Sequence, residues 1–250
     1  MENQPNIYLD HGASTPVHPD VVAAMLPYWT EHYGNPSSAH HFGRAAGSGL
    51  DKARRTIAKL IKTHPLEIVF TGCGSESDNL ALRGVMLQAR KEGRGNHLIV
   101  STIEHEAILE TAVSLRDQHG FDLTILGVDA FGQVSPNDVR AAMRDDTALV
   151  SIMAANNEIG TNQPIQEIGA IVREYGALFH SDAVQAAATT RWNMAEMPID
   201  LISFAPHKFY GPKGSGILYV RDGVRLLPTL TGGGQEEGRR SGTVNVPFAV

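Results

Sequence analysis

The sequence has very little cysteine, no excess of positive charge and no long apolar run. Its 250 residues include one cysteine, Cys73, which excludes an internal disulfide and a cysteine-rich zinc site. A net charge of -6 argues against nucleic acid or an acidic membrane surface as a partner. No run of about 18 apolar residues is present, and the start MENQPNIYLD lacks the basic and apolar parts of a secretion signal. We therefore expect a cytoplasmic protein with no metal site.

Apolar segments of strand length alternate with longer segments of helical period. With 42% hydrophobic and 19% charged residues, the composition is that of an ordinary globular domain. The alternation predicts an α/β fold with a mostly parallel, seven-stranded sheet flanked by helices. The predicted strands are 67–70, 97–101, 122–126, 148–153, 178–182, 201–205 and 216–220. The main predicted helices are 44–62, 77–92, 107–119, 136–144 and 165–175.

Ligands of such sheets bind at the carboxyl ends of the strands, so motifs at those ends are candidates for a site. The first is FTGCGSESDN, at 70–79, where a strand passes through a glycine turn into a helix. Free N–H groups and the helix dipole suit a phosphate there, and Ser75 adds a hydroxyl. Ser75 and Asp78 are equally consistent with a plain capping box. The motif is neither a P-loop nor GxGxxG, which disfavours a nucleotide.

Two further strand ends carry a histidine and an aspartate. His105, in STIEHEAI, fails the HExxH zinc pattern because Leu109 occupies the second histidine position, and it could equally be a surface or cap residue. LFHSDAVQ places Asp182 at a strand end and Gln185 three residues later. Asp182 is either a helix N-cap or the partner of a cationic ring nitrogen, as a pyridine electron sink requires.

The fourth strand end is SFAPHKFYGPKGSG, which places Lys208 beside His207 in a loop rich in glycine and proline. Such a lysine could simply cap a strand end in water. It could also form a Schiff base with an aldehyde, because desolvation and nearby positive charge lower the pKa of an amine and make it nucleophilic.

Taken in order, the phosphate turn, the histidine, the aspartate and the lysine resemble the pyridoxal-phosphate enzymes of the aspartate aminotransferase fold. More narrowly, the chain resembles a class V member, a cysteine desulfurase of the iron-sulfur-cluster and nitrogen-fixation type. The resemblance extends over nearly the whole chain, through the motifs IYLDHGASTPV, GNPSSAHHFGR, FTGCGSESDN, NNEIG, HSDAVQ, HKFYGPKG and GGGQEEGRRSGTVNV.

The resemblance implies a pyridoxal 5'-phosphate site in the large domain of such a transferase. The cofactor-binding residues would be Gly74, Ser75, Asn157, Asp182, Gln185, His207, Lys208 and Thr243. Lys208 would hold the aldehyde and His105 would stack on the ring and move protons. Asn35 would lie near the substrate. Thr243 would reach the phosphate of a neighbouring subunit, which implies a homodimer.

The implied reaction converts L-cysteine to L-alanine and passes sulfur to an enzyme cysteine as a persulfide for iron-sulfur cluster assembly. A scaffold or sulfur-acceptor protein would then be a partner. Two alternatives stay open. One is a selenocysteine lyase or another class V lyase or aminotransferase, and the other is a truncated, non-catalytic scaffold that binds the cofactor.

The chain departs from the family pattern at several positions. His11 and Gly12 stand where LDNAATTP is usual, and Ala205 replaces a phosphate-binding serine, a loss of about 1 kcal/mol. We expect residues 1–18 to pack with a C-terminal small domain that this chain lacks, and residues 19–250 to form the large domain. No residue matches the family's nucleophilic cysteine, since Cys73 lies in the phosphate turn.

Overall fold

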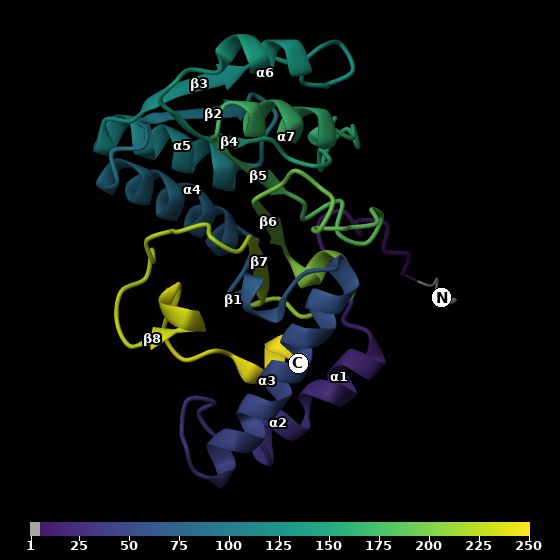
Figure 1. Cartoon of the computed structure of the whole chain (residues 1–250). Coiled ribbons are helices and arrows are strands. Elements are labelled where there is room, and N and C mark those ends of the chain that lie inside the picture. Colours follow the sequence, from purple (N-terminus) through teal and green to yellow (C-terminus); the bar gives the residue numbers. More distant parts are fainter. Residues whose placement is uncertain (1–5) are drawn as a thin grey trace.

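A seven-stranded sheet forms the centre of the computed structural model, which describes residues 6–250 (Figure 1). The strands are β1 Ile68–Thr71, β2 His97–Ser101, β3 Asp122–Leu126, β4 Thr147–Ser151, β5 Leu178–Asp182, β6 Leu201–Phe204 and β7 Gly216–Val220. Their order is β1-β7-β6-β5-β4-β2-β3, and only β7 runs antiparallel to its neighbours. The predicted mostly parallel sheet is confirmed, and all seven predicted strands match.

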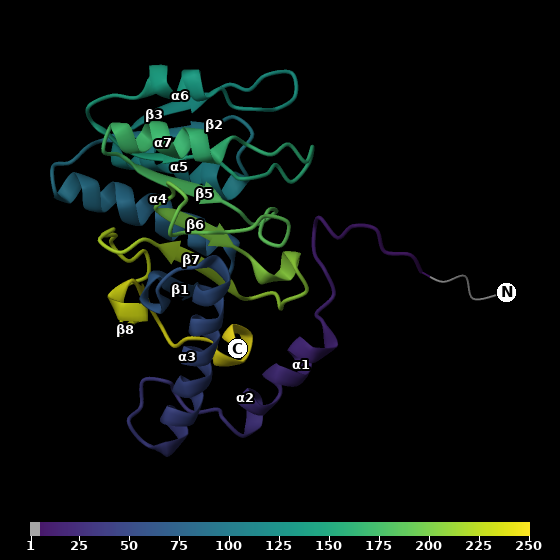
Figure 2. The same ribbon diagram turned by 45° about the vertical axis from the view of Figure 1, so that its right-hand side comes forward.

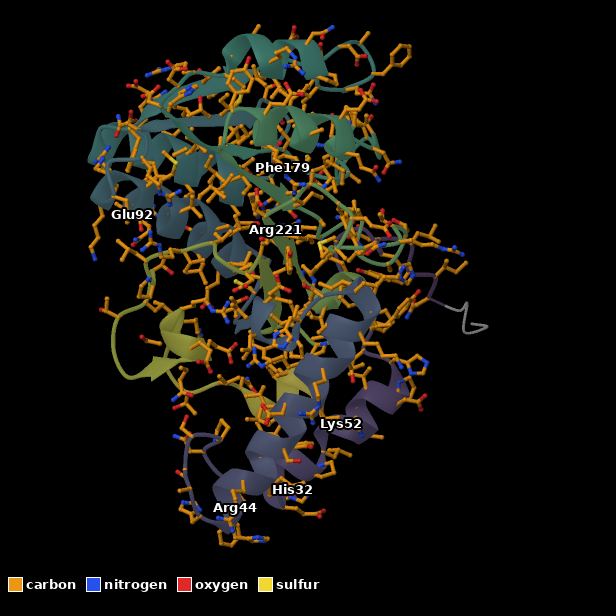
Figure 3. The ribbon with its side chains drawn as sticks, in the orientation of Figure 1. His32, Arg44, Lys52, Glu92, Phe179 and Arg221 are labelled. Atoms are coloured by element: carbon orange, nitrogen blue, oxygen red, sulfur yellow. The ribbon has the colours of Figure 1, made fainter. Side chains whose placement is uncertain are left out.

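Most strands are buried because both faces of the sheet are covered. Every residue of β1, β2, β4, β6 and β7 is buried, as expected for strands with helices on each side. Phe179 of β5 is fully buried in the middle of the molecule (Figure 3). The two edge strands differ, since β1 is buried whereas Ile125 of β3 is exposed.

Five helices cover the sheet, and the ends of all five were predicted to within three residues. They are α3 His41–Ile61, α4 Gly74–Lys91, α5 Glu106–His119, α6 Pro136–Ala142 and α7 Ile165–Glu174. The apolar residues of α4 and α5 form one buried cluster with the sheet. Those of α3, α6 and α7 form a second cluster. The two groups of helices therefore lie on opposite faces of the sheet (Figures 1 and 2).

Several short elements were not predicted. They are α1 Pro19–Met25, α2 Pro27–Thr30, β8 Gly234–Gln235, β9 Arg240–Ser241, α8 Val246–Ala249 and three 3-10 turns, Pro65–Glu67, Pro206–Lys208 and Glu236–Gly238. All except α1 span at most four residues, which is too short to show a hydrophobic period, and none of the seven residues of α1 is buried. Within residues 6–250, no helix has the length and apolar character needed to cross a membrane. Residues 1–5, which belong to the predicted N-terminal segment, lie outside the described residues.

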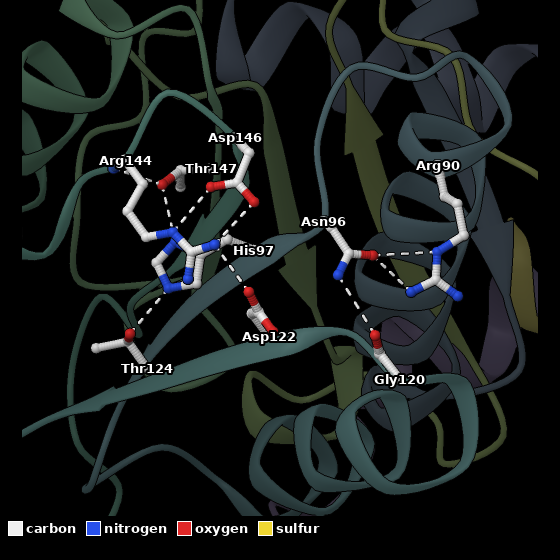
Figure 4. Close-up of polar contacts among 9 residues, drawn as sticks. All are labelled: Arg90, Asn96, His97, Gly120, Asp122, Thr124, Arg144, Asp146 and Thr147. Atoms are coloured by element: carbon white, nitrogen blue, oxygen red, sulfur yellow. Dashed lines mark hydrogen bonds and ion pairs between the residues drawn. The ribbon is translucent and has the colours of Figure 1, made fainter.

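Polar contacts join the amino ends of β2, β3 and β4 (Figure 4). The ring of His97 is fully buried and contacts Thr147 Oγ1 at 2.9 Å and Thr124 Oγ1 at 2.8 Å. Arg144 donates to Asp122 at 2.7 Å across the same end. These contacts fix the alignment of three strands at the edge opposite to the candidate site.

Candidate active site

Eight of the ten predicted site residues line one pocket, which has a volume of about 190 Å³. Each lies at or after the carboxyl end of a strand, and parallel strands bring those ends to one edge of the sheet. The eight residues are Gly74, Ser75, His105, Asn157, Asp182, Gln185, His207 and Lys208. The pocket is also lined by residues that the sequence analysis did not assign to it: Asp78, Met153, Ala155 and Val184.

One end of the pocket is the amino terminus of α4. The helix begins at Gly74, and Cys73 caps it because its Sγ accepts the N–H of Glu76 at 3.4 Å. The alternative of a capping box between Ser75 and Asp78 is wrong, since both residues lie inside the helix. The first N–H groups of a helix have no intrahelical acceptor, so this end can bind an anion.

Gly74 leaves space that a side chain would fill. A Cβ atom at this position would lie 3.2 Å from both Ala205 Cβ and Val184 Cγ2. This close approach explains why the turn carries glycine where the helix meets the loop after β6.

The negative charge of Glu76, in the first turn of α4, is offset by a nearby arginine. Glu76 accepts the N–H of Gly72 at 2.7 Å and pairs with Arg240 Nε at 2.8 Å. Arg240 lies in β9, far along the chain, and the sequence analysis did not assign it a role. Its cationic charge offsets the carboxylate that would otherwise repel an anion at this helix terminus.

Lys208 ends the 3-10 turn after β6 and points at the N-terminal segment. Its Nζ donates to the carbonyl of Gly12 at 2.6 Å, and Gln185 Nε2 donates to the same oxygen at 2.9 Å. Burial lowers the pKa of Lys208, while acidic side chains nearby, Asp182 first, act in the opposite direction. Gly12, where the sequence departs from the family pattern, therefore contacts two pocket residues through its carbonyl oxygen.

The N-terminal segment runs beside the loop that carries the lysine. The backbone N–H of Thr15 donates to the carbonyl of His207 at 2.8 Å, and the N–H of His18 donates to the carbonyl of Tyr210 at 3.0 Å. The N–H of Tyr210 donates in turn to Thr15 Oγ1 at 2.7 Å. Burial and the charges of two nearby lysines lower the pKa of His207.

Asp182 closes the inner side of the pocket. Its side chain is buried, and its Oδ1 accepts the N–H of Val184 at 2.9 Å. No helix begins here, so the alternative of a helix N-cap is wrong. Burial raises the pKa of Asp182, whereas the hydrogen bond from the N–H of Val184 and the positive charge of Lys208 lower it.

His105 lines the pocket and also caps α5. Its Nδ1 accepts the N–H of Ala107 at 3.1 Å, so both of the roles considered for it from the sequence are compatible. Because Nδ1 is the acceptor, this hydrogen bond assigns the ring proton to Nε2.

Asn35 and Thr243 do not line the pocket. Asn35 lies in the loop before α3, where its Oδ1 accepts the N–H of Ser37 at 3.0 Å. Thr243 is exposed just after β9. Asn35 was expected near the substrate, and Thr243 at the site of a second subunit. Both assignments stay predictions.

The chain is similar to known proteins along almost its whole length. The family model described as "Aminotransferase class-V" matches residues 7–248. A protein of Methanosarcina thermophila described as "Cysteine desulfurase IscS" is 49% identical over 244 residues, which cover 98% of this chain and 60% of that protein. The chain thus spans about three fifths of the length of this curated relative.

Two solved structures are similar along almost the whole chain. The structure described as "NIFS-LIKE PROTEIN" has a TM-score of 0.93 and 42% sequence identity, and the match covers 98% of this chain and 67% of the other. The structure described as "SspA in complex with cysteine" has a TM-score of 0.93 and 41% identity, with 98% and 70% covered. The chain belongs to the class-V aminotransferase family and is a homologue of the cysteine desulfurases.

Proposed function

We propose that this chain forms the cofactor-binding part of a pyridoxal-phosphate-dependent cysteine desulfurase. The reaction converts L-cysteine to L-alanine and passes sulfur to an enzyme cysteine as a persulfide, for iron-sulfur cluster assembly. The observation that carries the proposal is the meeting of Lys208, Asp182 and the amino terminus of α4 in one pocket. The family, whose members depend on pyridoxal phosphate, supports it. A cytoplasmic homodimer that delivers sulfur to a scaffold or acceptor protein is part of the same proposal.

The residues present fit the cofactor. The space beside Gly74, which a Cβ would fill, and the N–H groups of the α4 terminus suit a phosphate, with Ser75 and His207 next to them. The buried carboxylate of Asp182 suits a cationic ring nitrogen, and the Lys208 amine suits an aldehyde. When bound, pyridoxal phosphate supplies that aldehyde and an electron-accepting ring.

Lys208 would act first as a nucleophile and then as a base. Because burial lowers its pKa, a larger fraction of the amine is neutral at a given pH and able to attack an aldehyde. Once displaced by the substrate, the amine can take the α-proton of L-cysteine. Asp182 would keep the ring nitrogen protonated, and His105 would contact the ring and move protons.

Gln185 and Asn157 would hold the ring hydroxyl. Gln185 Nε2 bonds the Gly12 carbonyl, and Asn157 Nδ2 donates to Glu158 Oε1 at 2.9 Å. Both amides would exchange these partners for the cofactor oxygen. The Gly12 carbonyl would then be left without Gln185.

The sulfur acceptor is proposed to be a thiol other than Cys73. Cys73 is the one cysteine of the sequence, and its Sγ is used as the cap of α4. A sulfur covalently attached there would disturb the helix terminus that we assign to the phosphate. An added reducing thiol can take the place of the natural acceptor in an assay.

The test uses the 250-residue chain mixed with pyridoxal phosphate. We expect the absorbance of lysine-bound cofactor in the wild-type chain, its loss in Lys208→Ala, and its retention in Lys213→Ala, an exposed lysine of the same loop. Persistence of that absorbance in Lys208→Ala would contradict the assignment of the lysine.

The substrate is tested separately. With the cofactor bound and a reducing thiol present, sulfide and alanine formed in equal amounts from L-cysteine would support desulfuration. Faster turnover of L-selenocysteine, or transfer of the amino group without sulfide, would contradict the proposed reaction while leaving the cofactor site intact.

A further inference from the structure

Three carboxyl groups are buried together behind the pocket. The residues Asp78, Glu104 and Asp182 are 1%, 6% and 5% exposed, respectively. They come from three different places: Asp78 from α4, Glu104 from the loop before α5, and Asp182 from the end of β5. Asp78 and Asp182 both line the pocket. Buried carboxylates this close together cannot all stay ionised without opposing charge.

Asp78 lacks such an opposing charge. Its Oδ1 has no hydrogen-bond partner among the described residues and lies 3.8 Å from His180 Nε2. His180 is fully buried between Ser151 Oγ at 2.8 Å and Ser203 Oγ at 3.0 Å. Burial lowers the pKa of His180 to about 3, so its ring is neutral and supplies no positive charge to Asp78.

Asp182 is better placed to carry a negative charge. It accepts a backbone N–H from Val184, and the positive charge of Lys208 acts on it. Burial, and then repulsion by Asp182 and by Glu104, raise the pKa of Asp78 well above its ordinary value, and a contact with Ser203 offsets only part of this. When two interacting acids share a proton, the proton resides on the acid with fewer donors and cations around it.

We infer that Asp78 is a positioning residue, held as a neutral carboxylic acid, which leaves Asp182 as the ionised carboxylate that faces the pocket. A charged Asp78 would add a second buried negative charge next to Asp182 and drive a proton onto one of the two. The neutral form avoids this, and the Asp182 carboxylate is kept ready for a cationic partner. That this partner is the ring nitrogen of pyridoxal phosphate rests on the proposed function.

Infrared difference spectra of the cofactor-free chain test the inference directly. At about pH 7 we expect Asp78→Asn to lose a C=O stretching band of a protonated carboxylic acid relative to the wild type. The exposed Asp138→Asn, also in a helix, is the matched control and is expected to lose carboxylate bands instead. Loss of carboxylate bands in Asp78→Asn would overturn the inference.

A measurement without substitution covers the case in which Asp78→Asn does not fold. The wild-type chain is prepared with aspartate labelled with ¹³C at its side-chain carboxyl carbon. We expect a protonated-acid band that moves to lower frequency with the label. If no such band moves, every aspartate is ionised and the inference is wrong.

The cofactor-loaded chain provides a second readout. Burial raises the pKa of Glu104 to about 8, so Glu104 also ionises in the alkaline range and the comparison is made in the Glu104→Gln chain. As pH rises far enough to ionise Asp78, the absorbance of bound cofactor in Glu104→Gln is expected to change, and adding Asp78→Asn is expected to remove this alkaline transition. The same alkaline transition in Glu104→Gln with and without Asp78→Asn would overturn the inference. Failure of cofactor binding would count against the proposed function alone, because the infrared result does not depend on the cofactor.

Discussion

Replacing Glu104 with Gln should make the stability of the fold less sensitive to alkaline pH. Burial raises the pKa of Glu104 from an ordinary 4.5 to about 8, with Asp182 acting in the same direction. Hydrogen bonds from Ser101 Oγ and from the N–H of Met153, at 3.0 Å, only partly offset this. Oε2 of Glu104 has no hydrogen-bond partner among residues 6–250. Gln keeps the accepting oxygen and cannot ionise.

The direction in which stability changes with pH follows from the number of protons that the folded and unfolded chains bind. Between pH 4.5 and about 8 the folded chain holds a proton on Glu104 that the unfolded chain has released, so stability falls as pH rises through this window. Below the window both states are protonated and the effect disappears. A rise of the pKa from 4.5 to about 8 corresponds to a loss on the order of 5 kcal/mol across the window.

Urea unfolding at about pH 5 and about pH 8.5 measures this difference. We expect Glu104→Gln to resemble the wild type at the lower pH and to exceed it by several kcal/mol at the higher pH. The exposed Glu110→Gln on α5 controls for the loss of one acidic charge. If the free energy of unfolding changes by the same amount between the two pH values in the wild type and in Glu104→Gln, the reasoning is refuted.

Two further substitutions test packing and a buried ion pair. Phe179→Ala leaves a cavity at a fully buried position in β5 and should lower the free energy of unfolding by about 3–5 kcal/mol, measured in urea. A change below about 1 kcal/mol would show that the surrounding side chains fill the cavity without strain. Glu236→Ala removes two bonds to Arg54, at 2.7 and 2.9 Å, and one from the N–H of Phe70 at 2.9 Å. A loss of about 3 kcal/mol is expected, and an unchanged unfolding midpoint would contradict the role of this pair.

Most of the sheet could be predicted because its strands are buried on both faces. Residues 98–100 of β2 and 217–220 of β7 are continuous apolar runs, which stand out against the helical periods around them. The reversed direction of β7 could not be predicted, since it depends on pairing with β1 and β6 and not on local composition. Helix α3 begins at His41, three residues before the predicted start, because His40 Nδ1 caps it by accepting the N–H of Gly43.

The candidate site was predictable where a residue directly follows a strand. Asp182 and Lys208 follow strands in the sequence, so the order of elements alone brings them to one edge. Asp78 was considered only as a capping residue, because one helical turn separates it from the strand end and nothing local shows that it faces the sheet. Gly12 was noticed only as a departure from the family pattern, since its contact with Lys208 spans almost the whole chain.

The pairing of the N-terminal segment with the lysine loop also bears on how the chain folds during synthesis. Thr15 bonds His207, and His18 bonds Tyr210, so the two sides of this contact are 192 residues apart in the sequence. Contacts of such high sequence separation form late, because closing a long loop is entropically unfavourable. On a ribosome the first residues must wait until the segment with Lys208 has emerged. This side of the pocket is therefore completed late, and a nascent chain that ends before this loop cannot hold its amino-terminal segment in place.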